Sequence, residues 1–135
     1  QIGKTWVMEE FGRQCYDHYV KFDFDEQSEL ASVFQITKDP HRIIKELGLF
    51  SDVPLLPEKT LIIFDEIQEC EEAINSLKYF CENAPEYHII AAGSLLGVAV
   101  NKKHMKMPVG KVSVFRIYPL TFREFLRAAD PKLFD

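Results

Sequence analysis

The chain has little of what marks several other classes of protein. It holds only three cysteines, Cys15, Cys70 and Cys81, and no two of them form a CxxC pair. An odd number of scattered thiols indicates a reducing compartment, so we expect a cytoplasmic protein without disulfide bonds. No apolar run approaches the roughly 20 residues of a membrane-spanning helix, and we expect no membrane partner.

The signatures of several enzyme classes are also missing. The four histidines have no metal-ligand spacing, and the chain has no HExxH motif, nucleophile elbow or dinucleotide fingerprint. The net charge of −5 argues against nucleic-acid binding by this segment alone. The hydrophobic fraction of 47% and the charged fraction of 27% are ordinary for one globular domain with a core of its own.

The chain begins with Gln1-Ile2-Gly3-Lys4-Thr5, which matches the end of the phosphate-binding loop GxxxxGK[ST]. The first glycine of that loop would lie three residues before Gln1. In such a loop, backbone N–H groups at a helix N-terminus bind phosphate oxygens. Lys4 would reach the β- and γ-phosphates, and Thr5 would place its hydroxyl on Mg²⁺. Because GKT alone is common by chance, a solvated lysine at a helix start is the competing interpretation.

An acidic pair follows a continuous apolar stretch about sixty residues later. Residues 61–64 predict a buried strand that ends in Asp65 and Glu66. Ligands of open α/β sheets lie at the carboxyl ends of the strands. Asp65 would hold the shell of Mg²⁺, and Glu66 would deprotonate the attacking water. An acidic helix N-terminus is the alternative, but the two motifs together favour a nucleoside triphosphatase.

The remaining pattern alternates strands and helices. We expect a helix from Gly3 or Lys4 through Phe11, with Trp6, Val7 and Phe11 facing inward. The other expected strands, helices and loop are listed by residue range: strands 19–24, 59–64, 87–92 and 111–117, helices 25–34, 40–49, 70–82 and 95–100, a helix beginning at Thr121, and a loop over 51–58. Asp39 is expected to cap the helix that starts at Pro40.

This alternation predicts an α/β fold with a mostly parallel sheet. The strand that would feed the phosphate loop is not among the four expected strands. In this class of fold that strand is central, and its absence would leave unpaired backbone on both of its neighbours. We therefore expect the natural protein to extend upstream of Gln1.

Four stretches together resemble a known family. They are Gln1 to Thr5, LIIFDEIQ at 61–68, SLKYFCENAPEYHIIAAGSLLGVA at 76–99 and YPLTFREFL at 118–126. The chain is similar over essentially its whole length to the prokaryotic AAA-type P-loop ATPases that usually carry a C-terminal domain of unknown function. In that family the acidic strand ends in DEIQ, and the next strand ends in GS.

The resemblance implies a three-layer AAA+ nucleotide-binding core over residues 1–135 with the sheet order 5-1-4-3-2. That core would lack its first strand and the start of its phosphate loop, and it would end before the helical lid and the C-terminal domain. The resemblance further implies that the domain binds and hydrolyses ATP with Mg²⁺.

The family pattern also assigns roles to single residues. Ser94 after the third strand would be the first sensor of the γ-phosphate, although a simple Gly-Ser turn is the alternative. Catalysis would then rest on Glu66, Lys4 and Ser94, and the metal would lie at Thr5 and Asp65. The residues expected to bind the nucleotide are Gln1, Ile2, Gly3, Lys4, Thr5 and Trp6.

Three functions remain open at this point. The first is an ATPase that couples hydrolysis to a conformational change in a larger protein. The second is a nucleotide-binding switch with little turnover, and the third is a DNA-associated ATPase module, which the acidic charge disfavours for this segment. The sequence identifies neither the protein partner nor the oligomeric state, and a homo-oligomer stays one of the alternatives.

Overall fold

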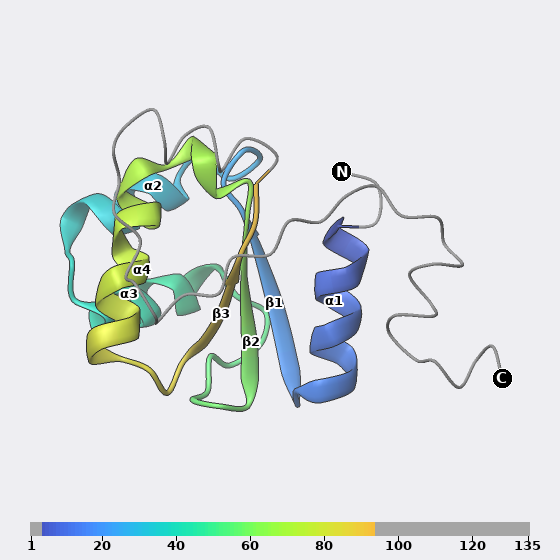
Figure 1. Cartoon of the computed structure of the whole chain (residues 1–135). Helices are drawn as coiled ribbons and strands as arrows, with labels where there is room; N and C mark the ends of the chain where they lie inside the picture. Colours follow the sequence, from blue (N-terminus) through green and yellow to red (C-terminus); the bar gives the residue numbers. More distant parts are fainter. Residues whose placement is uncertain (1–3, 94–135) are drawn as a thin grey trace, which may run out of the picture.

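The computed structural model describes residues 4–93, which form a parallel sheet between two helical layers (Figure 1). The strands lie in the order β1-β2-β3 and are β1 (His18–Asp23), β2 (Thr60–Asp65) and β3 (His88–Ala91). Helix α1 (Lys4–Cys15) covers one face of the sheet. The other face carries α2 (Leu30–Ile36), α3 (Pro40–Leu47) and α4 (Glu71–Asn83). The predicted α/β fold with a parallel sheet is therefore confirmed.

The strand order agrees with part of the predicted order 5-1-4-3-2. Both strand pairs are parallel, and β2 lies between β1 and β3. This corresponds to the neighbours 4-3-2 of the prediction. The expected strand over 111–117, and every helix expected after residue 94, lie outside the described residues.

The core is divided by β2, whose six residues are all buried. Successive side chains of a strand point to opposite faces. Leu61 and Ile63 pack with Met8 of α1, whereas Ile62 and Phe64 belong to the larger core under α2, α3 and α4. The continuous apolar run in the sequence thus reflects a strand covered on both faces.

Helix α1 differs from the prediction in length and in orientation. It continues to Cys15, and its buried positions are Met8 and Gly12. Trp6 and Phe11, which were expected to face inward, are 39% and 43% exposed. The helical period of 3.6 residues aligns Met8 and Gly12 on the sheet side and turns both aromatic residues away.

Gly12 lets α1 approach the sheet closely, and its replacement gives a testable prediction. A Cβ at this position would lie 2.6 Å from Tyr19 Cβ. Gly12→Ala should therefore lower the free energy of unfolding by about 1–3 kcal/mol, despite the gain of about 1 kcal/mol in helix propensity. Gly48→Ala is the matched control, since a Cβ there meets nothing within 4 Å. Denaturant unfolding would check the pair, and equal stability of the two variants would contradict the close packing of α1.

The expected helix over 25–34 is wrong in its first half. Helix α2 starts only at Leu30. Before it, the Asp23 carboxylate accepts hydrogen bonds from the backbone N–H groups of Asp25 and Glu26, at 2.9 and 3.2 Å. Side-chain hydrogen bonds of this kind favour turns over helix, which explains the late start of α2.

Other boundaries are close to the predictions. The Asp39 carboxylate accepts a hydrogen bond from His41 N at 3.1 Å, which confirms the predicted cap of α3. The expected helix 40–49 ends at Leu47 and continues as the short 3₁₀ helix η1 (Gly48–Phe50). A second 3₁₀ helix, η2 (Ile67–Glu69), joins β2 to α4.

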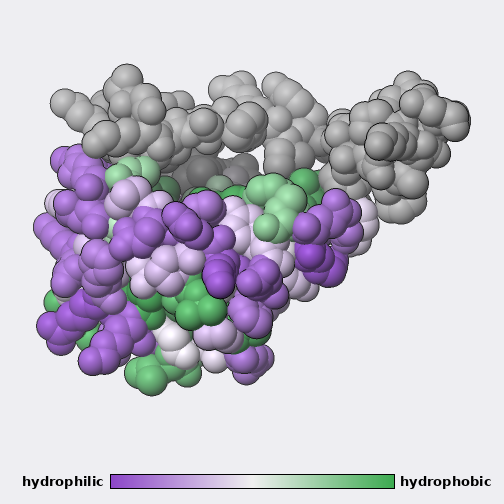
Figure 2. All heavy atoms as spheres, turned by 90° about the horizontal axis from the view of Figure 1, so that it is seen from below, coloured by the Kyte–Doolittle hydropathy of each residue, from purple (hydrophilic) through white to green (hydrophobic). Residues whose placement is uncertain are grey.

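The molecular surface is mostly hydrophilic on the side that Figure 2 shows, with apolar residues in small separate patches. Among the described residues, the most exposed large hydrophobic side chains are Leu49, at 80%, and Ile36, at 63%. Among the helices within residues 4–93, none has the length and apolar character needed to cross a membrane.

Candidate functional site

The strand ends bring the predicted site residues to one edge of the sheet. Parallel pairing places Asp23 directly beside Asp65, and Phe64 beside Ala91. Glu66 follows Asp65 immediately and leads into η2. The N-terminal end of α1 lies at the same edge (Figure 1). This is the edge at which open α/β sheets bind their ligands.

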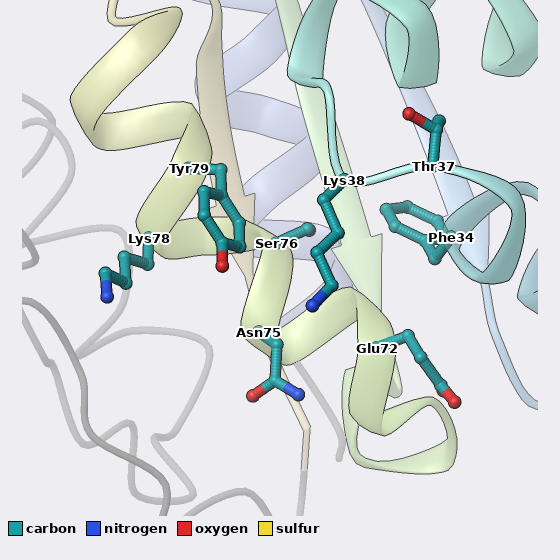
Figure 3. Close-up of a pocket in the computed structure, with 8 residues that line it drawn as sticks. All are labelled: Phe34, Thr37, Lys38, Glu72, Asn75, Ser76, Lys78 and Tyr79. Atoms are coloured by element: carbon teal, nitrogen blue, oxygen red, sulfur yellow. The ribbon is translucent and has the colours of Figure 1, made fainter.

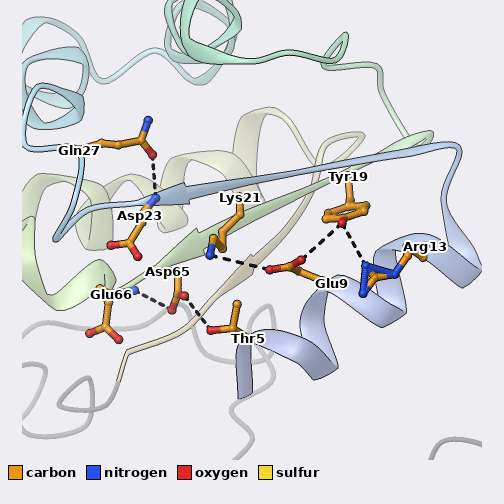
Figure 4. A network of polar contacts seen from close by, with 9 residues as sticks. All are labelled: Thr5, Glu9, Arg13, Tyr19, Lys21, Asp23, Gln27, Asp65 and Glu66. Atoms are coloured by element: carbon orange, nitrogen blue, oxygen red, sulfur yellow. Dashed lines mark hydrogen bonds and ion pairs between the residues drawn. The ribbon is translucent and has the colours of Figure 1, made fainter. Parts of the chain in front are cut away.

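A direct contact joins the two sequence motifs. Thr5, in the first turn of α1, donates a hydrogen bond from Oγ1 to Asp65 Oδ2 at 3.1 Å (Figure 4). Asp65 is only 3% exposed, and its other oxygen accepts from Glu66 N at 2.9 Å. The predicted juxtaposition of the GKT segment and the acidic strand is thus present, although the two lie 60 residues apart in sequence.

The first turn of α1 adds a favourable field for an anion. The N-terminal N–H groups of a helix carry a partial positive charge of about half a unit. The helix begins at Lys4, so these groups belong to the segment predicted to bind phosphate. The structure thus places a helix terminus suited to phosphate beside a buried carboxylate suited to a cation.

The Thr5–Asp65 pair fits a magnesium ion in the manner usual for nucleotide sites. Mg²⁺ takes one or two protein oxygens and completes its octahedron with water and substrate phosphates. A hydroxyl and a carboxylate oxygen 3.1 Å apart offer such a pair. Residues 4–93 contain no group of three or more acidic, histidine or cysteine side chains able to hold a metal by themselves. Any ion here would therefore need further ligands from nucleotide and water.

Glu66 has an unusual backbone. Its φ of 53° and ψ of 43° lie in the left-handed region, which costs an L-residue about 1–2 kcal/mol. Within residues 4–93, Glu58 is the other non-glycine residue with positive φ. The Glu66 carboxylate oxygen Oε2 accepts a hydrogen bond from Gln68 Nε2 at 2.5 Å. Strained conformations of this kind often occur at functional sites, where the surroundings hold them in place.

A separate set of polar contacts joins α1 to β1 (Figure 4). Lys21 lies 3.8 Å from a carboxylate oxygen of Glu9. The hydroxyl of Tyr19 donates to Glu9 at 3.4 Å and accepts from Arg13 at 3.2 Å. These contacts hold α1 on the sheet, because each joins a side chain of α1 to one of β1.

Cys70 lies between η2 and α4, and its side chain makes no capping hydrogen bond. Burial raises the pKa of its thiol, so the group stays protonated at neutral pH. The thiol donates a weak hydrogen bond to Glu72, with sulfur and oxygen 3.7 Å apart. Cys70 is therefore a packing residue, whereas Cys15 is exposed on α1.

A pocket of about 260 Å³ lies on the helical side of the domain (Figure 3). Its lining comes from α2, the residues after it and α4, and consists of Phe34, Thr37, Lys38, Glu72, Asn75, Ser76, Lys78 and Tyr79. None of these residues was predicted to bind nucleotide. Its volume is below the range of about 300–1,000 Å³ in which small-molecule sites usually fall. The strand ends therefore remain the candidate site.

The sequence missed two residues of this region. Asp23 ends β1 next to Asp65, and the recurrence of aspartate at two strand ends was a signal that could have identified it. Gln68 gave no such signal, since its contact with Glu66 depends on the left-handed turn between β2 and η2. Four predicted site residues, Gln1, Ile2, Gly3 and Ser94, lie outside the described part of the chain.

Comparison with known proteins gives one finding. A family model described as an AAA domain matches residues 1–126. No curated protein and no solved structure matches the chain.

Proposed function

The chain belongs to the AAA domain family of P-loop ATPases, and from this premise we propose that it binds and hydrolyses ATP with Mg²⁺. A generic nucleotide-binding role follows from the family itself. The hydrolysis, the metal and the roles of single residues are our proposal. The observation that carries it is the hydrogen bond between Thr5 and Asp65, which joins the GKT segment to the acidic strand.

The N-terminal segment would bind the triphosphate. Backbone N–H groups of Gln1, Ile2, Gly3, Lys4, Thr5 and Trp6 would face phosphate oxygens, as they do in phosphate loops generally. The ammonium group of Lys4 would neutralise charge on the β- and γ-phosphates. These contacts supply both affinity and orientation, since phosphoryl transfer depends mainly on positioning and charge stabilisation.

The acidic strand end would supply the metal site and the base. Thr5 and Asp65 would hold Mg²⁺, which offsets the negative charge of the phosphates when bound. Glu66 would accept a proton from the water that attacks the γ-phosphate. Ser94, which follows β3 in the sequence, would contact the γ-phosphate, and this contact would be lost after hydrolysis. The acid–base work therefore falls on Glu66.

The Thr5–Asp65 pair gives a direct test. Wild-type protein should bind ATP more tightly with Mg²⁺ than with EDTA. In Thr5→Val, the ratio of the two Kd values should be smaller by about tenfold or more. Thr5→Ser is the matched control, since it keeps the hydroxyl and should keep the ratio. Isothermal titration with ATP in each buffer measures both. An undiminished magnesium effect in Thr5→Val would contradict the metal assignment.

A further inference from the structure

The Gln68 side chain lies between the carboxylate of Glu66 and the end of β3. Its Nε2 donates to Glu66 Oε2 at 2.5 Å. The two residues are only two apart in sequence, and they meet because the left-handed backbone at Glu66 turns the chain sharply before η2. The amide therefore restrains the side chain to which our proposed function assigns the base.

The other end of the amide lies against Gly93. A Cβ at this glycine would lie 1.9 Å from Gln68 Oε1 and 3.1 Å from Gln68 Cδ. Gly93 has no left-handed φ, so a side chain here would act by shifting the Gln68 amide and would not strain the backbone. Any side chain at position 93 would displace Gln68.

Backbone hydrogen bonds hold both partners in place. Ile67 N donates to Ala92 O at 3.0 Å, and Ala92 N donates to Phe64 O at 2.8 Å. Together these bonds join η2, the end of β3 and the end of β2. The Gln68 amide thus lies beside hydrogen-bonded backbone and next to Gly93, the residue that precedes Ser94.

The hydrogen bonding of the Gln68 side chain indicates that the amide has a role beyond packing. Gln68 Oε1 is buried, and no hydrogen-bond partner for it occurs within residues 4–93. A buried acceptor without a partner is unfavourable, and methionine would fill a similar volume without one. The donor that Gln68 presents to Glu66 is the feature that methionine could not replace.

We propose that Gln68 is a positioning residue that orients the Glu66 carboxylate for catalysis and links it to the end of β3 through contact with Gly93. This inference rests on the proposed ATPase function. Gln68 does not touch the reacting atoms. It acts by limiting the rotamers of Glu66, so that the carboxylate is held in place while it accepts a proton from the attacking water.

The first test replaces the amide by an apolar group of similar size. Gln68→Met in the full-length protein should lower kcat for ATP hydrolysis about 10- to 100-fold and leave the Kd for ATP within about twofold. Gln14→Met is the matched control, since Gln14 Nε2 also donates to a glutamate. Its partner is Glu10, at 2.9 Å, on the solvent-exposed side of α1. Gln14→Met should change neither constant. Gln68→Glu, which keeps the length but replaces the donor by a carboxylate, should lower kcat at least as far.

A second test uses the contact with Gly93. Gly93→Ala should reproduce the fall in kcat, because its methyl group displaces the amide. Gly93→Ala combined with Gln68→Ala should be no slower than Gln68→Ala alone, since the clashing atoms are gone. Such non-additivity is expected for residues in contact or in one network, and not for distant, independent sites. Thermal unfolding of each variant would show whether it is folded when kcat is measured.

The outcomes separate this inference from the function on which it rests. Wild-type kcat in Gln68→Met, or a raised kcat, would overturn the positioning role while leaving the ATPase intact. If Gln68→Met lowers ATP affinity and thermal stability along with kcat, Gln68 has a structural role, and this result would also overturn the positioning role. If the wild-type protein releases no phosphate, both the proposed function and the inference fall.

Discussion

Glu66→Gln is expected to keep ATP binding and to lower the steady-state rate of ATP hydrolysis about 100-fold or more. Glutamine has nearly the same shape as glutamate but cannot accept the proton of the attacking water. Because the change removes one charge and almost no volume, the Kd for Mg-ATP should stay within a few-fold. Phosphate release and isothermal titration on the full-length protein would measure the two effects separately.

Glu58→Gln is a close control for this experiment. Glu58 also has a left-handed backbone, with φ of 64°, but it lies just before β2, at the opposite end of the strand from Glu66. Its replacement should leave hydrolysis unchanged. Wild-type turnover in Glu66→Gln, or equal losses in both variants, would show that Glu66 is not the base.

The second large effect concerns stability. Phe64 is fully buried at the centre of an aromatic cluster, with ring centroids of Phe22, Phe24, Phe34 and Phe80 at 5.6–6.5 Å. Phe64→Ala should therefore lower the free energy of unfolding by about 3–5 kcal/mol, through lost burial and the cavity that remains. Denaturant unfolding monitored by circular dichroism would measure the loss.

The matched control replaces a phenylalanine outside this cluster. Phe50 in η1 is 40% exposed, and Phe50→Ala should cost less than about 1 kcal/mol. If Phe64→Ala is no less stable than Phe50→Ala, the cluster around β2 does not form the core that the structure shows. That result would also remove the scaffold that holds Asp65 and Glu66.

The elements that the sequence predicted well are those whose hydrophobic pattern favours one type of secondary structure. A short continuous apolar run ending in two acidic residues favours a buried strand at the ligand edge of a sheet, and β2 is that strand. Helix α1 was harder, because aromatic residues stand on the side turned away from the sheet while Gly12 lies against it. Residue type alone does not decide burial, since much of any protein surface is apolar.

The site was predictable only in part, for physical reasons. Asp65 and Glu66 could be placed because strands deliver their last residues to the ligand edge of the sheet. The region before α2 was misjudged because the turn depends on side-chain hydrogen bonds, those of Asp23 with the following N–H groups and of Gln27 with Asp23 N. Gln68 could not be recognised, since its contacts with Glu66 and Gly93 require the three-dimensional meeting of η2 and β3.

The most direct test of the central claim is phosphate release from ATP by the full-length protein, with Mg²⁺ and with EDTA. We predict steady turnover that requires the metal and stops when EDTA removes it, because the site between Thr5 and Asp65 depends on a cation to offset phosphate charge. ATP that binds but is never hydrolysed in the presence of Mg²⁺ would contradict the ATPase and would favour a nucleotide-binding switch.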